Sequence, residues 1–207
     1  MAWKQTLKEL WQKEKWYWLA AVVLGVLLSL LFAAHWTEGY ADMIQKGIGG
    51  KVVRFHVLAN SDSEADQNLK LAVRDAVGSF MQEKLTDVEN LEECELVVRQ
   101  SLGEIEEAAA ETIAENGYDY DVTAELEHTS FPVKNYGSYT FPAGDYEALR
   151  IVIGEGNGHN WWCVMYPNMC FSDSMYEVVD EEAGEKLREV LTTEEYEKVL
   201  AEGDYQV

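Results

Sequence analysis

The side chains best suited to chemistry or recognition gather between residues 146 and 171, which read YEALRIVIGEGNGHNWWCVMYPNMCF. An apolar run leads into a glycine-rich turn, and His159, Trp161, Trp162 and two cysteines follow the turn. Only Glu147, Arg150 and Glu155 are formally charged in this stretch, although the whole chain carries a net charge of −22. We therefore expect the segment to be either a core element or a surface on which a partner docks.

Catalytic patterns are weak in this chain. It has no Gly-x-Ser-x-Gly elbow, so a serine hydrolase is not indicated. With 38 carboxylates available, almost any pair could be read as a glycosidase dyad, and that pattern carries little information. The glycine-rich turn lacks the Lys-Ser/Thr of a phosphate-binding loop. His159 could serve as a general base, but a turn residue without chemistry is the better interpretation.

Metal and cofactor sites are not indicated either. The sequence contains no Cys-x-x-Cys, His-x-x-x-His or His-Glu-x-x-His spacing. A zinc site would need an assembly of His56, His128 or His159 that no local pattern announces. The sequence thus predicts no catalytic residue, no metal, no cofactor and no small-molecule substrate.

The acidic balance limits the classes of partner. Residues 37–207 contain 36 of the 38 acidic residues and 12 of the 16 basic ones, which is a balance of −24. Such a surface disfavours the neutralisation of nucleic-acid phosphates and docking on anionic lipid. We expect most of these acids to lie on solvated helix faces, and we expect no nucleic-acid partner.

An uncharged run occupies residues 16–37 and reads WYWLAAVVLGVLLSLLFAAHWT. As a helix it would be about 33 Å long, which matches a hydrocarbon core of about 30 Å. Four lysines within residues 1–15 precede it, so the positive-inside tendency leaves the N-terminus in the cytoplasm and the remainder outside. The run is expected to be a membrane anchor. A cleaved secretory signal, with a processing site at Gly39-Tyr40-Ala41, is the alternative.

The chain has three cysteines. In an oxidising compartment Cys163 and Cys170 could close a short loop by a disulfide, and two buried thiols are the alternative. Cys94 lies within a helical pattern and is expected at the core or its boundary.

The rest of the chain supplies the elements that position these residues. Residues 38–50 are expected to form a juxtamembrane linker that ends in two glycines. Residues 51–59 are rich in Val, Leu and Phe and predict a strand. Ser63, with Asp66 three positions later, is typical of a helix start, and apolar residues at helical spacing follow. A second long helix is predicted over residues 90–115.

From residue 118 the pattern changes to an alternation of apolar and polar residues, as in half-buried strands. Residues 146–153 predict a further strand whose continuous apolar character suits a central position. The order of elements predicts an α+β domain over residues 51–172, with two long helices packed on a mainly antiparallel sheet. Residues 173–207 are expected to form an acidic helical extension that breaks or turns at Thr192-Thr193.

Two segments carry a family resemblance. FHVLANSDSEADQNLKLAVRDAV at residues 55–77 and the stretch at residues 146–171 closely resemble stage II sporulation protein R, a family of signalling proteins of endospore-forming bacteria. The intervening FPVKNYGSYTFPAGDY also looks like that family. Asn60-Ser61-Asp62 and Asn160-Trp161-Trp162-Cys163 are the most specific parts. Glu64 is a mild departure, since a proline often stands at that position in the family.

The resemblance implies a role without catalysis. Such proteins are made in the forespore and activate a membrane-bound aspartic protease, which removes the pro-sequence of a mother-cell sigma factor. An activator of this kind must bind the active state of its partner better than the inactive state. The protein is therefore expected at the cell membrane with an extracytoplasmic domain, or secreted into the space between the two sporulation membranes.

The surface around the tryptophan pair is the first candidate contact with the protease, since tryptophan is enriched at binding hot spots. Polar neighbours and polar residues of the first strand complete the expected partner-binding set: Asn160, Trp161, Trp162, His159, Asn60, Asp62, Arg54 and His56. Because adjacent strand residues point to opposite faces, one or both tryptophans could instead be core residues. A competing function is cell-wall binding or modification, with Asp62, Glu155 and His159 as polar groups and the tryptophans stacking on sugars.

Overall fold

The computed structural model describes residues 2–167, 169 and 181–200. The chain divides into two compact units, Met1–Met43 and Ile44–Val207. Helix α1 is continuous over Ala2–Gly49. Residues 38–49, which the sequence suggested as a linker, are therefore helical.

The first unit contains the apolar run. Within the described residues, Glu14–Gly49 of α1 is long and apolar enough to cross a membrane, judged by length and composition. Its large side chains are exposed, with Leu24 at 57% and Leu28 at 58%. This exposure suits a lipid environment and is compatible with a membrane anchor as well as with a signal sequence.

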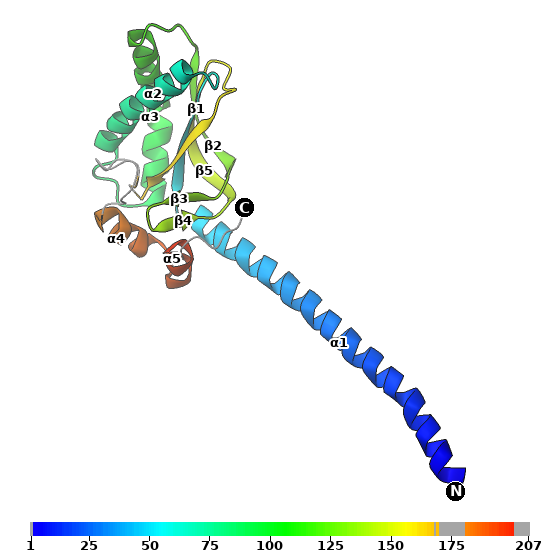
Figure 1. Cartoon of the computed structure of the whole chain (residues 1–207). Coiled ribbons are helices and arrows are strands. Elements are labelled where there is room, and N and C mark those ends of the chain that lie inside the picture. Colours follow the sequence, from blue (N-terminus) through cyan, green and yellow to red (C-terminus); the bar gives the residue numbers. More distant parts are fainter. Residues whose placement is uncertain (1, 168, 170–180, 201–207) are drawn as a thin grey trace. The chain divides into compact units, whose positions relative to one another are not determined.

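The second unit is built on a four-stranded mixed sheet with the order β2-β5-β1-β6 (Figure 1). The strands are β1 (Val53–Leu58), β2 (Val122–Phe131), β5 (Gly144–Ile153) and β6 (Asn160–Tyr166). β1 and β5 are parallel, whereas β2 pairs with β5 and β6 pairs with β1 in antiparallel fashion. The predicted α+β class is confirmed. The strand predicted over residues 146–153 is β5, and its expected central position in the sheet is confirmed as well.

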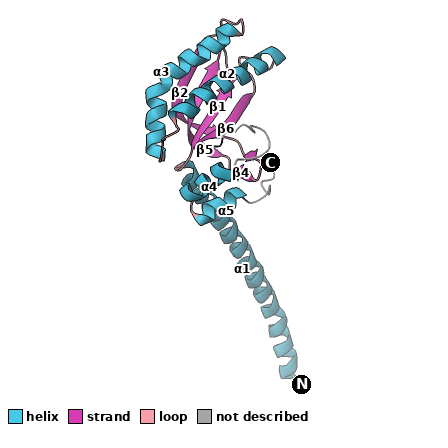
Figure 2. Ribbon diagram, turned by 90° about the vertical axis from the view of Figure 1, so that its left-hand side faces the viewer, coloured by secondary structure: helices cyan, strands magenta, loops and turns pink. Residues whose placement is uncertain are grey.

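Two long helices cover one face of this sheet (Figure 2). They are α2 (Glu64–Lys84) and α3 (Leu91–Glu115). Their apolar residues form one cluster with Phe55 and Val57 of β1. The predicted start of α2 is confirmed, since the Ser63 hydroxyl accepts a hydrogen bond from the Asp66 amide at 3.1 Å.

A second hydrophobic cluster covers the opposite face, which the sequence did not predict. It involves the hairpin of β3 (Lys134–Tyr136) and β4 (Tyr139–Phe141), and the C-terminal helices α4 (Glu181–Val190) and α5 (Thr193–Leu200). The end of α1 also contributes. Its buried members include Ile44, Ile48, Phe131, Phe141, Tyr146, Leu187, Leu191 and Val199. The expected break between the terminal helices is confirmed.

Candidate functional site

The two segments that carry the family resemblance meet at one edge of the sheet. β1 and β5 are parallel, so their carboxyl ends lie side by side, and the antiparallel β6 begins at the same edge. The turn of residues 60–63 after β1 therefore lies against the glycine-rich loop of residues 154–159. This edge is the candidate site.

Backbone contacts lock the turn and the loop together. The amide of Asn157 donates to the Asn60 carbonyl at 3.1 Å, and the amide of Gly158 donates to the Ala59 carbonyl at 2.9 Å. A Cβ on Gly158 would lie 2.5 Å from the Ser61 carbonyl carbon. Gly154 has φ +56°, a conformation that glycine adopts without steric cost. The close approach of turn and loop, together with the positive φ, therefore accounts for glycine at these two positions.

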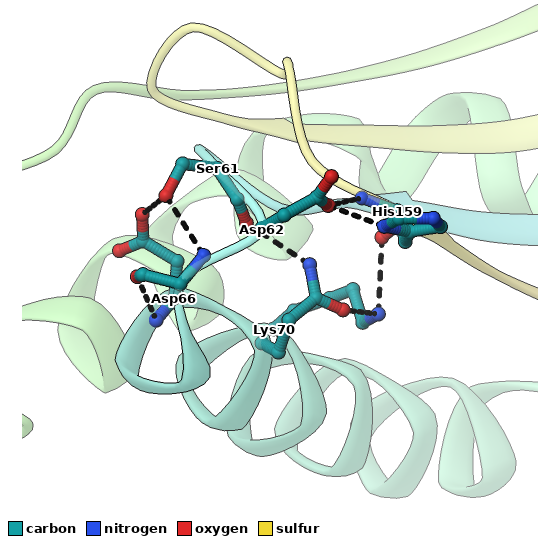
Figure 3. A network of polar contacts seen from close by, with 7 residues as sticks. Ser61, Asp62, Asp66, Lys70 and His159 are labelled. Atoms are coloured by element: carbon teal, nitrogen blue, oxygen red, sulfur yellow. Dashed lines mark hydrogen bonds and ion pairs between the residues drawn. The ribbon is translucent and has the colours of Figure 1, made fainter.

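Asp66, at the start of α2, is the centre of a polar network with the turn (Figure 3). Its carboxylate accepts hydrogen bonds from the Ser61 hydroxyl at 2.5 Å and from the Asn60 amide group at 3.0 Å. The hydrogen bonds from Ser61 and then from Asn60 lower the pKa of this carboxyl below its ordinary value. Asn60 also accepts from the Glu155 amide at 3.0 Å, so one side chain joins the helix to the loop.

Lys70 and His159 extend the network towards the loop (Figure 3). The Lys70 ammonium donates to the His159 carbonyl at 3.0 Å and to the Gln67 side chain at 2.6 Å. Lys70 is 6% exposed, and its burial lowers the pKa of the ammonium group. The backbone entering β6 is thus held by a buried cation of α2.

Asp62 and His159 form the exposed part of the site. The Asp62 carboxylate accepts the His159 amide hydrogen at 2.7 Å and also pairs with Nδ1 of the imidazole. The side chains are 56% and 79% exposed. The hydrogen bond from the His159 side chain, followed by that from its amide, lowers the pKa of the Asp62 carboxyl. The pair is therefore pre-oriented and open to a partner.

The Asp62–His159 pair is only part of what a hydrolytic site requires. A carboxylate that orients an imidazole is one component of a hydrolytic site, but such a site also needs a nucleophile within hydrogen-bond reach. The hydroxyl of Ser61 instead donates to Asp66. In the part of the chain that the structure describes, no group of three His, Cys, Asp or Glu side chains could hold a metal ion.

The tryptophan pair lies next to this edge, with one ring on each face of the sheet. Trp161 packs edge-on against Phe55 at 5.4 Å between centroids, on the side of α2 and α3. Trp162 stacks on His56 at 4.8 Å and contacts Phe131 on the other side. Both rings are half-buried. Each tryptophan therefore joins a core cluster and keeps an accessible part.

Arg54 and His56 are placed differently from the sequence expectation. They were expected to present polar side chains at the end of the first strand, and this is wrong, since they are 0% and 2% exposed. The second hydrophobic cluster covers the sheet face to which they point. Neither residue can touch a partner directly in this structure. Burial, with the positive charges of Arg150 and Arg54, lowers the pKa of His56 to about 4.

Lys134 is a neighbour of this site that sequence reasoning missed. It lies on the β3–β4 hairpin, and its ammonium is 5.7 Å from the centroid of the Trp162 ring. The FPVKNYGSYTFPAGDY stretch pointed to this hairpin as family-like, but it did not single out a lysine.

The cysteines differ in state. Cys94 is a buried free thiol, and its burial raises its pKa to about 12. Cys163 is disulfide-bonded. Cys170 lies outside the described residues, so the pairing of Cys163 with Cys170 remains a prediction.

Comparisons with known proteins agree on one family. The family model described as Stage II sporulation protein R (spore_II_R) matches residues 49–176. A curated protein of that name from Bacillus subtilis (strain 168) is 39% identical over 158 residues, which cover 76% of this chain and 70% of the relative. No solved structure matches.

Proposed function

The chain belongs to the stage II sporulation protein R family, and on that premise we propose that it activates a membrane-bound aspartic protease during sporulation. The protease would process the precursor of a mother-cell sigma factor, and catalysis would reside in the protease. The domain from Ile44 onwards would act outside the cytoplasm, delivered either by a retained anchor or by a cleaved signal. Activation then depends on tighter binding to the active state of the protease.

The observation that carries this proposal is the union of the two family-like segments at one edge of the sheet. Asn60 and Asp66 hold the turn, Gly158 allows the loop to approach it, and His159 pairs with Asp62. Residues about 97 positions apart thus build a single rigid surface. Preorganisation of this kind reduces the ordering cost of binding.

The exposed part of this surface is where the protease is proposed to dock. It consists of Asp62 and His159, together with the half-buried Asn160 and Trp162 beside them. Trp161 faces the helices and is proposed to have a mainly structural role.

A genetic experiment tests the activation role itself. The gene is deleted in a sporulating host, and the fraction of processed sigma factor is followed by immunoblot. Processing should disappear and should return when the full chain is restored. Normal processing in the deletion strain would refute the function. A parallel turnover assay of the full chain on purified peptidoglycan should be negative, and turnover would favour the cell-wall alternative.

A second experiment tests the docking surface. His159→Ala removes an imidazole that is 79% exposed, and His128→Ala removes a comparably exposed imidazole (78%) on β2 as the control. The His159 variant should lower processing about ten-fold, equivalent to about 1.4 kcal/mol of binding, and the His128 variant should not. Both should unfold within a few degrees of wild type. Equal processing by the two variants would place the docking surface elsewhere.

A further inference from the structure

Three nitrogen-bearing side chains, Arg54, His56 and Lys134, lie near one another on the sheet face opposite α2 and α3, where the carboxylates of Glu125 and Glu127 pair with Arg150 instead. Several other basic groups of this acidic chain pair with carboxylates: Lys51 with Glu195 at 2.5 Å, Lys84 with Glu104 at 2.9 Å, and Arg99 with Glu147 at 3.3 Å. Around Arg54, His56 and Lys134, by contrast, the described residues provide no ion pair. This local group of basic side chains contrasts with the overall composition of 38 acids and 16 basic residues.

Arg54 is the deepest of the three. Its guanidinium donates from Nε to the Cys163 carbonyl and from Nη2 to the Tyr136 hydroxyl, each at 2.9 Å, while Nη1 is buried without a partner. Four aromatic ring centroids lie between 4.3 and 5.8 Å from the guanidinium carbon, those of Phe131, Tyr146, Phe141 and Tyr136. Aromatic faces compensate a cation only in part. A buried charge without a counter-ion is costly.

His56, on the same strand, is also buried, at 2% exposed. It stacks on Trp162 with 8° between the ring planes, and neither ring nitrogen has a hydrogen-bond partner. A neutral imidazole supplies no negative charge, so it does not neutralise Arg54.

Lys134 and Trp162 are the accessible side of this cluster. Both are half-buried, and the ammonium lies against the indole ring. Burial and, next, the charge of Arg54 lower the pKa of Lys134. The surface thus combines an apolar ring with a cation that burial has partly stripped of water. Such a cation gains more from an arriving carboxylate than a fully solvated lysine does.

We propose that Lys134 and Trp162 form a docking site for an acidic segment of the protein partner, whose carboxylate pairs with Lys134 while the rest of the segment lies on the indole. The proposal rests on the proposed function, because it names the chemistry of the partner that the same surface binds. A lipid phosphate is a poorer occupant, since residues 37–207 carry a balance of −24 and an anionic leaflet repels them. A single acidic segment would contact Lys134 at short range. Salt screening over about 8 Å weakens its repulsion by the more distant acids of this chain.

The test uses the full chain in membranes of sporulating cells. A water-soluble carbodiimide joins an ammonium and a carboxylate that are in direct contact, and mass spectrometry identifies the joined peptides. The Lys134 peptide should carry an Asp or Glu of the membrane-bound protease. In Lys134→Gln the adduct should disappear and sigma-factor processing should fall about ten-fold, since a charged hydrogen bond is lost. Lys134→Arg should retain processing.

Lys84→Gln is the matched control. Lys84 also has its ammonium near an aromatic ring, at 5.1 Å from the centroid of Phe80, but it already has a carboxylate partner in Glu104. This variant should process like wild type. Wild-type processing in Lys134→Gln, or a Lys134 adduct to an acid of this same chain, would overturn the docking site. An adduct to a different protein, with processing independent of this chain, would refute the protease role while supporting an acidic partner.

Discussion

The imidazole of His56 lies parallel to the indole of Trp162, with 4.8 Å between the ring centroids and 8° between the planes. His56 belongs to β1 and Trp162 to β6, and the two residues are direct partners in the antiparallel ladder. Burial first, then the positive charges of Arg150 and Arg54, disfavour the protonated imidazole and lower the pKa of His56 to about 4. The fold therefore couples the packing of a surface tryptophan to the protonation state of a buried histidine.

The first prediction concerns the pH dependence of stability. The pKa of His56 is about 4 in the folded chain against 6.5 when unfolded, so the unfolded chain binds the proton first. The free energy of unfolding should fall by about 3 kcal/mol as the pH drops from 6.5 to 4. His56→Phe keeps a ring on Trp162 and removes the titration. Denaturant unfolding of the full chain in detergent at several pH values should show a flatter profile for the variant; identical profiles would contradict the assignment.

Much of the fold could be predicted from local pattern. The starts of α2 and α3, the alternation in β2 and the break between α4 and α5 all depend on residues close in sequence, such as Ser63 and Asn90 at the helix starts. The strand order could not be predicted in this way. The placement of β5 between β2 and β1 depends on contacts across about a hundred residues, for which the sequence has no short-range signal.

The contacts within the candidate site could not be predicted from the sequence for the same reason. Asn60 and the glycine-rich loop were recognised as separate segments, but the sequence did not indicate that Asn60 binds the Glu155 amide. Arg54 and His56 alternate with apolar residues, and this pattern usually marks a solvent-facing side of a strand. Here the hairpin, the C-terminal helices and the end of α1 cover that side. The polar character of Arg54 and His56 therefore led to the wrong expectation that their side chains are exposed.

The second prediction tests the interlock of turn and loop. In Gly158→Ala the new Cβ meets the Ser61 backbone, which cannot yield without displacing the turn. We expect a loss of about 1–3 kcal/mol in unfolding free energy. Gly103→Ala is the control, because Gly103 lies within α3 with open space around its Cβ position, and the substitution should stabilise the chain by about 0.5–1 kcal/mol. A neutral Gly158→Ala would show that the loop is not tightly held.

The third prediction concerns the thiols. Cys94 is buried with its pKa raised to about 12, and Cys163 is disulfide-bonded. An alkylating reagent without reductant should therefore label no cysteine in the native full chain. It should label one after denaturation, and all three after denaturation with reductant. Labelling of three thiols in denaturant without reductant would exclude a bridge between Cys163 and Cys170.

The fourth prediction concerns topology. Lysines precede the apolar stretch of α1, and this favours a cytoplasmic N-terminus. A reporter that is active only outside the cytoplasm, fused after Asn60, should be active in cells. The same reporter fused after Lys13 should be inactive. The reverse pattern, with both fusions well expressed, would invert the orientation.

The last prediction separates the polar network from the docking surface. Asp66, at the start of α2, accepts hydrogen bonds from both Ser61 and Asn60. Asp66→Ala removes this acceptor and leaves both donors in the turn without their partner. An unsatisfied donor that is partly buried costs about 1–3 kcal/mol, so the variant should unfold at a lower denaturant concentration than wild type.

The pH dependence of this effect follows from the pKa of Asp66, which is lowered in the folded chain. The stabilisation by the Asp66 carboxylate is therefore present above the unfolded pKa of 3.8 and is lost as the pH falls through the folded value. The stability difference between wild type and variant should therefore narrow only at acidic pH, below the window in which His56 titrates.

His159→Ala should unfold like wild type, since the backbone amide at position 159 still donates to Asp62 and the exposed ring that is removed supports no core contact. If Asp66→Ala unfolds like wild type while His159→Ala is strongly destabilised, the roles assigned to the two residues are reversed, and the exposed pair would be the structural one.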